Sequence, residues 1–230
     1  METQWSNTSE PVEMERATLR KSLRPVLIVS AQDLTEHAPF LGRLLVGMAD
    51  ESIPVALICP PGFDTESVAP APAALFTHPL VPLPLMEHMG IDRLTLQLER
   101  FRPTVLHCLC ESRAALTRQI ARRLDLPYVI MVNSLAAKVR RLPLSSHRCA
   151  RIVVPAETIH GHVSRALPRF ADRVVQINMG SFVDTDMMCF SNPSRLPSVV
   201  VAYPLRRAWH FANFFKAIKS LRADNREFMV

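Results

Sequence analysis

Short apolar runs and amphipathic segments alternate along most of this chain. The clearest case has an apolar run at Val105–Leu109, a helical pattern at Ala114–Leu124 and a second apolar run at Tyr128–Val132. Asp125 and Pro127 end the helical pattern. Apolar runs of this length suit buried strands, and apolar residues at every third or fourth position suit helices. Strand, helix and strand with short connections predict a βαβ unit with parallel strands.

The same alternation occurs before and after this unit. Further strands are expected at 25–30, 55–59, 150–155, 173–177 and 199–203, with a weak strand near 80–83 and the start of another at 226–230. Further helices are expected at 40–50, 90–101, 136–142, 158–167 and 209–221. Loops are expected at 31–39 and 60–84. This order predicts an α/β fold, a Rossmann-like doubly wound parallel sheet covered by helices.

The domain organisation follows from where the pattern weakens. Residues 1–22 are polar and predict a flexible tail, and residues 23–185 hold the complete alternating pattern. Residues 186–198 read as a linker, and residues 199–230 as the incomplete start of a second Rossmann-like domain. Roughly 45 residues bury too little surface for a core of their own. They are therefore expected to dock on the first domain or to open a missing second one.

The charge is moderately basic, with 27 Lys and Arg against 21 acidic residues. This balance suits anionic partners such as nucleotide phosphates or acidic lipid headgroups, although many cytosolic enzymes share it. A nucleic-acid partner is not predicted, because aromatic residues make up only 7 % and no helix-turn-helix or RNP-like pattern is present. Lys138, Arg140 and Arg141 form the densest basic run. They face either a phospholipid or phosphate group, or simply solvent.

Glycine and cysteine usage exclude several kinds of site. The chain has 6 glycines and neither a GxGxxG nor a GxxxxGK[ST] motif, which argues against a glycine-rich phosphate loop. Its 5 cysteines are odd in number and mostly lie in apolar runs, which predicts reduced thiols and a cytoplasmic protein. Cys108 and Cys110 share one strand face, but two thiols without further ligands make a poor metal site. No metal or other cofactor is expected, and neither a spanning segment nor a secretory signal is present.

Several strings of the sequence resemble the N-terminal half of a GT-B glycosyltransferase of the retaining family 4. They are RPTVLHCLCES, LDLPYVIMVNS, RIVVPAE, VVQINMGSFVDTD and PSVVVAYPLRRAWHFANFFKAIKSL, in the order in which that family has its counterparts. The resemblance runs from about Pro25 to the end of the chain. It implies an acceptor-side domain followed by the start of the donor-side domain.

The resemblance implies transfer of a hexose from a nucleotide sugar to a glycan or lipid acceptor. The family's glycine-containing loop after the first strand is replaced by AQDLTEHAP, and a family histidine by Asn133. The acidic E-x7-E region of the donor half has no counterpart. The chain is therefore expected to be truncated or degenerate and inactive alone, with a separate chain as a possible source of the donor domain. The alternative is a non-enzymatic Rossmann-like module that binds a nucleotide or a glycan.

The candidate residues lie near the ends of predicted strands or in the segments that resemble the glycosyltransferase family. The expected cleft residues are His107, Asn133, Glu36, His37 and Glu157, the expected cleft turn holds Asn178 and Gly180, and the phosphate candidates are Arg206 and Arg207. Each of these residues also has an interpretation without a binding role: a histidine of the core, an amide or carboxylate that caps a helix, or a residue of a plain turn. The expected location is the cytoplasm, with peripheral contact at the inner face of an anionic membrane as a further possibility.

Overall fold

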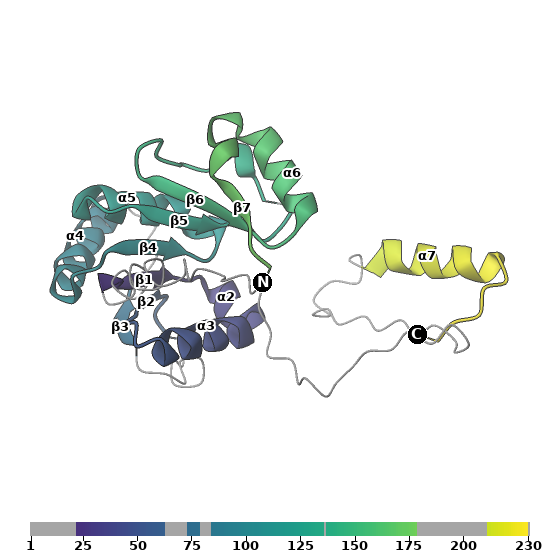
Figure 1. Ribbon diagram of the computed structural model, residues 1–230, viewed down its shortest axis with the longest axis horizontal. Helices are drawn as coiled ribbons and strands as arrows, with labels where there is room; N and C mark the ends of the chain where they lie inside the picture. Colours follow the sequence, from purple (N-terminus) through teal and green to yellow (C-terminus); the bar gives the residue numbers. More distant parts are fainter. Residues whose placement is uncertain (1–21, 63–72, 79–83, 136, 179–210, 230) are drawn as a thin grey trace, which may run out of the picture. The chain divides into compact units, whose positions relative to one another are not determined.

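The computed structural model describes residues 22–62, 73–78, 84–135, 137–178 and 211–229 (Figure 1). The chain divides into two compact units, Met1–Ser181 and Phe182–Val230. Each unit is described by itself below. The predicted tail and linker, most of the predicted cleft turn and the predicted strand at 199–203 lie outside the described residues.

A seven-stranded parallel sheet forms the centre of the first unit. Its strands lie in the order β3-β2-β1-β4-β5-β6-β7. They are β1 (Pro25–Ile28), β2 (Ala56–Cys59), β3 (Ala74–Thr77), β4 (Val105–Cys108), β5 (Tyr128–Met131), β6 (Cys149–Val154) and β7 (Val174–Gln176). Every neighbouring pair is parallel, from the β2–β3 pair to the β6–β7 pair. The predicted Rossmann-like α/β fold is confirmed.

Helices cover both faces of this sheet, as Figure 1 shows. On one face, α4 (Pro84–Phe101), α5 (Ala114–Leu124) and α6 (Glu157–Ala166) pack on a core that contains Val26 and Ile28 of β1. On the other face, α2 (Ala31–Glu36) and α3 (Ala38–Asp50) pack on a core that contains Leu27 and Val29. Successive residues of a strand point to opposite faces, so β1 contributes to both cores.

Local sequence explains where α5 begins and ends. Its apolar face buries Leu116, Ile120 and Ala121, at the spacing that predicted the helix. Asp125 follows with a positive φ of 54°, and the Leu126 amide donates to the Ala121 carbonyl at 3.0 Å. This geometry is a Schellman cap, which closes the last turn before Pro127 starts the approach to β5.

The region expected to be a loop at 31–39 instead contains α2 and the start of α3. Ser30 is the N-cap of α2, and Asp33 completes a capping box with it. The Ser30 side chain accepts from the Asp33 amide, and the Asp33 carboxylate accepts from the Ser30 amide. Two otherwise unsatisfied amides of the first turn are thereby paired, which makes a helix of only six residues stable here.

Three further expectations are corrected. The basic stretch expected to be a helix at 136–142 contains only the short 3-10 helix η2 (Val139–Arg141), because Val139 is its one buried residue and no apolar stripe continues. Strand β3 lies inside the expected loop 60–84. In place of the start of a strand expected at 226–230, the described residues 226–228 are irregular and Met229 forms an isolated bridge. Two other 3-10 helices, η1 (Glu111–Arg113) and η3 (Pro168–Arg173), complete the first unit.

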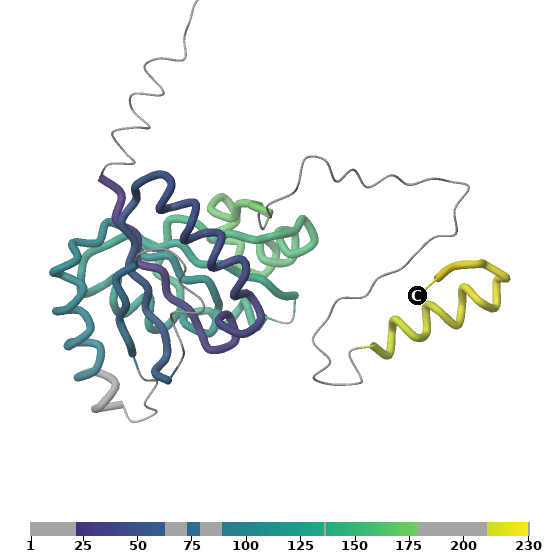
Figure 2. Tube along the Cα trace, turned by 90° about the horizontal axis from the view of Figure 1, so that it is seen from below, coloured from purple at the N-terminus to yellow at the C-terminus, as the bar shows by residue number. Residues whose placement is uncertain are grey.

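The described part of the second unit is α7 (Ala212–Ala223) and a short segment after it. The chain reverses direction after α7 (Figure 2), and Asn225, just beyond the helix, has a positive φ of 51°. The Arg226 amide donates to the Leu221 carbonyl at 3.0 Å, which caps the end of the helix. None of the residues of α7 is buried, and Phe215 and Leu221 are exposed.

The cysteines and the helix lengths bear on the expectations of reduced thiols and of no membrane-spanning segment. Cys59, Cys108, Cys110 and Cys149 are buried free thiols, as expected, and Cys189 lies outside the described residues. Within the part of the chain that the structure describes, no helix is both long enough and apolar enough to span a bilayer.

The capping box makes a testable prediction for the stability of the fold. Substitution Ser30→Ala removes the side-chain acceptor and one donor to the buried Asp33 carboxylate, so we expect the free energy of unfolding to fall by about 1 kcal/mol. Urea unfolding at neutral pH measures this difference. Gln32→Ala, on the exposed side of the same helix, is the control and should change stability by less than about 0.5 kcal/mol. Equal losses for the two variants would contradict the capping role.

Candidate functional site

The strand order places a topological switch point between β1 and β4. From β1 the chain adds β2 and then β3 on one side, and it returns to add β4 and its successors on the other. Connections therefore diverge at the carboxyl ends of β1 and β4, where open α/β sheets bind their ligands. The residues just beyond these ends, together with those after β5, form the candidate site.

A small hollow lies at this switch point. Its polar lining is Asp33 and His37 from the segment after β1 and Asn133 from the end of β5, and its apolar lining is Val29, Phe40, Leu41 and Leu109. Its volume of about 10 Å³ holds at most one water molecule. The predicted candidates His37 and Asn133 thus come together, and Asp33 joins them.

Asp33 is held firmly at the edge of the hollow. It is only 6 % exposed. Its Oδ2 accepts hydrogen bonds from the Ser30 amide at 2.8 Å and from the Ser30 hydroxyl at 2.7 Å. Because its carboxylate occupies the first turn of α2, this helix start presents a negative charge rather than free amides.

Asn133 has one polar atom in use and one free. Its Nδ2 donates to the Leu109 carbonyl at 3.2 Å, which ties the end of β5 to the end of β4. Its Oδ1 is buried and has no hydrogen-bond partner. A buried carbonyl oxygen without a donor is costly, so this atom is available to accept a hydrogen bond from a ligand hydroxyl or amide.

Arg113 is a buried cation just beyond β4. It ends η1, precedes α5 and is only 5 % exposed. Its Nη1 is buried and has no partner. Within the described residues the ion pairs are Arg123–Asp92 and Arg148–Asp125, so no carboxylate compensates this guanidinium. Burial of an uncompensated charge is strongly unfavourable, which marks Arg113 as a candidate for binding an anionic group.

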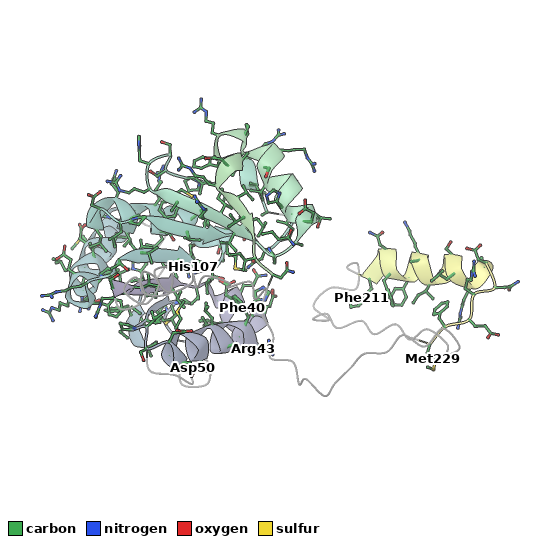
Figure 3. The ribbon with its side chains drawn as sticks, in the orientation of Figure 1. Phe40, Arg43, Asp50, His107, Phe211 and Met229 are labelled. Atoms are coloured by element: carbon green, nitrogen blue, oxygen red, sulfur yellow. The ribbon has the colours of Figure 1, made fainter. Side chains whose placement is uncertain are left out.

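His107 is the third of the four residues of β4, one position before the carboxyl end at which the sequence placed it. It pairs in register with Leu27 of β1 and Val129 of β5, in the middle of the sheet. Figure 3 labels it among the side chains of the first unit. Its Nε2 is buried without a partner, and burial lowers the pKa of its imidazole from 6.5 to about 4. His107 is therefore a neutral, half-buried side chain on a face of the sheet, and it does not line the hollow at the switch point.

Two thiols lie between these groups. The Cys108 thiol donates to the Cys110 carbonyl at 2.9 Å, and the Ser112 hydroxyl donates to the Cys110 sulfur at 3.4 Å. The hydrogen bond with Cys108, burial and the negative charge of Asp33 together raise the pKa of the Cys110 thiol. Cys110 is thus protonated at neutral pH and unsuited to act as a nucleophile. No group of three or more metal-ligating side chains occurs among the described residues.

The other predicted site residues are more dispersed. Glu36 accepts from Gln32 within α2, which orients it along the helix surface. Glu157 is exposed in the first turn of α6, and Asn178 is exposed after β7, where it accepts from Gln176. The structure does not bring these three residues into the hollow. Gly180, Arg206 and Arg207 lie outside the described residues.

Sequence reasoning missed Asp33 and Arg113. The pattern Ser30-x-x-Asp33 directly after an apolar run is a capping-box signature and would have identified α2 and its acidic residue. Arg113 had only a weak signal, an arginine between an apolar run and an amphipathic helix. Its burial depends on tertiary packing, which the spacing of the sequence does not reveal.

Comparisons with known proteins extend this description. No family model matches the chain, and no curated protein matches it. Its structure is similar to part of a glycosyltransferase from Rickettsia africae, with a TM-score of 0.55 and 9 % identity over 68 % of this chain and 42 % of that one. It is similar to part of Anabaena HepE, solved in complex with UDP and glucose, with a TM-score of 0.55 and 9 % identity over 69 % of this chain and 45 % of that one.

A third similar structure is the lipopolysaccharide outer core galactosyltransferase WaaB. Here the TM-score is 0.53 and the identity is 8 %, over 76 % of this chain and 51 % of that one. The chain thus matches about half or less of each of these three proteins. At these identities the likeness establishes a shared fold. The Rossmann-like architecture is therefore one that glycosyltransferases also have.

The pKa of His107 predicts how stability depends on pH. Between pH 6.5 and about 4 the unfolded chain binds a proton at this histidine that the folded chain does not, so stability falls as the pH falls through this window. Between pH 7 and pH 5 this contribution amounts to about 2 kcal/mol. Substitution His107→Leu, which suits the apolar sheet face, should make the unfolding free energy less dependent on pH by this amount.

Urea unfolding of both proteins at the two pH values measures the difference. His147→Leu is the matched control, because His147 is exposed. It should leave the pH dependence of the wild-type protein unchanged. An unaltered pH dependence in His107→Leu would show that the imidazole is not a neutral buried group.

Proposed function

We propose that the first unit is the acceptor-side domain of a glycosyltransferase-like protein of the GT-B type, similar to family 4. The complete activity is transfer of a hexose from a nucleotide sugar to a glycan or lipid acceptor. The observation that carries the proposal is the presence of two unused buried polar atoms, Asn133 Oδ1 and Arg113 Nη1, beyond the adjacent strands β5 and β4. The fold shared with glycosyltransferases supports it.

These two groups favour an acceptor that carries hydroxyls and an anionic group. Asn133 Oδ1 accepts a hydrogen bond from a sugar hydroxyl, and it cannot serve as a general base. Arg113 offers a planar set of donors that suits a carboxylate or a phosphate. A glycan bearing an acidic substituent, or a lipid acceptor with a phosphate, has both kinds of group.

The geometry at α2 argues against donor binding by this unit. Asp33 places a buried carboxylate in the first turn, where the resembled family has a glycine-containing loop that approaches the donor phosphates. A diphosphate would meet like charge there instead of free amides. The first unit on its own therefore binds acceptor without catalysing transfer. Donor binding then requires a separate chain that supplies the donor domain, and Arg206 and Arg207 of this chain are candidates for additional phosphate contacts.

The second candidate function is a non-enzymatic glycan-binding module. It is favoured by Asn133, which stands where the resembled family has a histidine, and by the carboxylate at α2. Both functions predict glycan binding at the carboxyl edge. They differ in whether a nucleotide sugar is turned over when the whole chain and any partner are present.

The first test is calorimetric titration of the full chain with UDP-, GDP- and ADP-sugars. We expect no binding in the micromolar range, because the α2 carboxylate opposes a diphosphate. Micromolar binding of one of these sugars would contradict the acceptor-side assignment, and Asp33→Asn should then strengthen the binding further. In parallel, a panel of glycans with and without carboxylate or phosphate groups should show binding confined to the acidic members.

Substitution Arg113→Met separates a binding role from a structural one. If Arg113 binds an anionic group of the acceptor, affinity for the acidic glycans of the panel should fall at least about tenfold, the effect of losing a charge-assisted hydrogen bond. The unfolding free energy should stay constant or rise, because a buried unpaired charge is replaced by an apolar side chain. Arg118→Met, at an exposed position of α5, is the control for both measurements. Unchanged affinity combined with a large loss of stability would reject the binding role.

A further inference from the structure

A second hollow lies along the crossover from β5 to β6. It is formed between η2 and the second half of α6, and its volume is about 430 Å³. Lys138, Arg140 and Arg141 line it from the η2 segment, and His162 and Arg165 line it from α6. None of these residues takes part in the hollow at the switch point. The two sites are therefore separate.

The charge in this hollow is uncompensated. None of the described residues that line it is acidic. In the described part of the chain, neither ion pair involves its lysine or its arginines. The cations also come from two elements far apart in the sequence, so they are not merely one solvated helix face. Like charges brought together in this way repel each other, and a bound anion relieves that repulsion.

The base of the hollow is apolar and ordered. Val139 is 2 % exposed and belongs to the core under α4, α5 and α6. The Arg141 amide donates to the Lys138 carbonyl at 2.9 Å, and the Leu142 amide to the Val139 carbonyl at 3.0 Å. These bonds fix the short turn that carries the cations. An apolar base with basic walls suits a phosphate group attached to a small apolar group.

We propose that this hollow binds a phosphate-bearing ligand through Arg141 of η2 and Arg165 of α6. Arginine fits phosphate oxygens with pairs of parallel N–H donors, and the remaining cations add to the attraction. A phospholipid headgroup and a soluble organic phosphate present the same group. The proposal does not depend on the glycosyltransferase-like function, because it uses none of the residues at the switch point.

A neighbouring basic hollow provides the comparison. It has a volume of about 510 Å³ and is lined by Arg118 and Arg122 of α5 and by Arg148. Arg148 pairs with Asp125 at 2.6 Å, so part of the charge there is already neutralised. Removal of Arg118 and Arg122 lowers the net charge of the domain as much as removal of Arg141 and Arg165. The double substitution R118A/R122A is therefore a matched control for the double substitution R141A/R165A.

The experiment compares the full chain and both double variants with two kinds of probe. One arm measures co-sedimentation with phosphatidylcholine vesicles that contain or lack phosphatidylglycerol. The other arm measures calorimetric binding of glycerol 3-phosphate and of inorganic phosphate. Unfolding midpoints confirm that the variants are folded, as expected for substitutions at exposed positions.

We expect R141A/R165A to reduce affinity at least about tenfold, and R118A/R122A to reduce it less than about threefold. The arm in which the wild-type chain binds identifies a lipid or a soluble phosphate as the source of the group. R141K/R165K should recover only part of the affinity, because lysine keeps the charge but not the paired donors. Equal losses in the two double variants, or no wild-type binding in either arm, would overturn the proposal.

Discussion

The pairing of β1 with β4 is the constraint on which the candidate site depends. The two strands pair from Pro25 with Val105 to Ile28 with Cys108, and the Leu109 amide extends the ladder to the Ile28 carbonyl. This pairing brings the segment after β1 beside the segment after β4. Asp33, Asn133 and Arg113 consequently lie beyond the ends of strands that are adjacent in the sheet, although up to 100 positions separate them in the sequence (133 minus 33). A parallel sheet concentrates its unpaired polar groups at one edge because all of its strands end there.

The strand-helix alternation was predictable because it rests on periodicity. Leu116, Ile120 and Ala121 repeat at helical spacing, and the strands of the central unit are short apolar runs between breaking residues. The six-residue helix α2 was not predictable from periodicity, since it is too short to show a stripe, and its evidence is the local Ser30–Asp33 pair. The helix expected at 136–142 failed for the opposite reason. Its residues favour a helix, but Val139 is the one buried residue of η2, and Ala137 and Leu142 beside it pack on the core only in part.

The candidate residues likewise divide into those whose position was predictable from the sequence and those whose position was not. Asn133 and His37 were predictable because a polar residue just beyond an expected parallel strand must lie near the carboxyl edge. His107 lies one position before the end of its strand and half-buried on a face of the sheet, where burial lowers the pKa of its imidazole and where it does not line the hollow. Arg113 was not predictable, because the burial of a charge is decided by the side chains that pack around it.

The crossover from β5 to β6 determines where the folded first unit is most susceptible to proteolysis. Most parallel crossovers pass through a full helix, whose backbone is shielded by its own hydrogen bonds. This one passes through η2 and irregular chain, and it carries Lys138, Arg140, Arg141 and Arg148. Short hydrogen-bonded turns open locally more easily than a full helix, so trypsin should nick the folded unit first along this crossover. Protection of these peptide bonds would then report occupancy of the basic hollow without any label on the ligand.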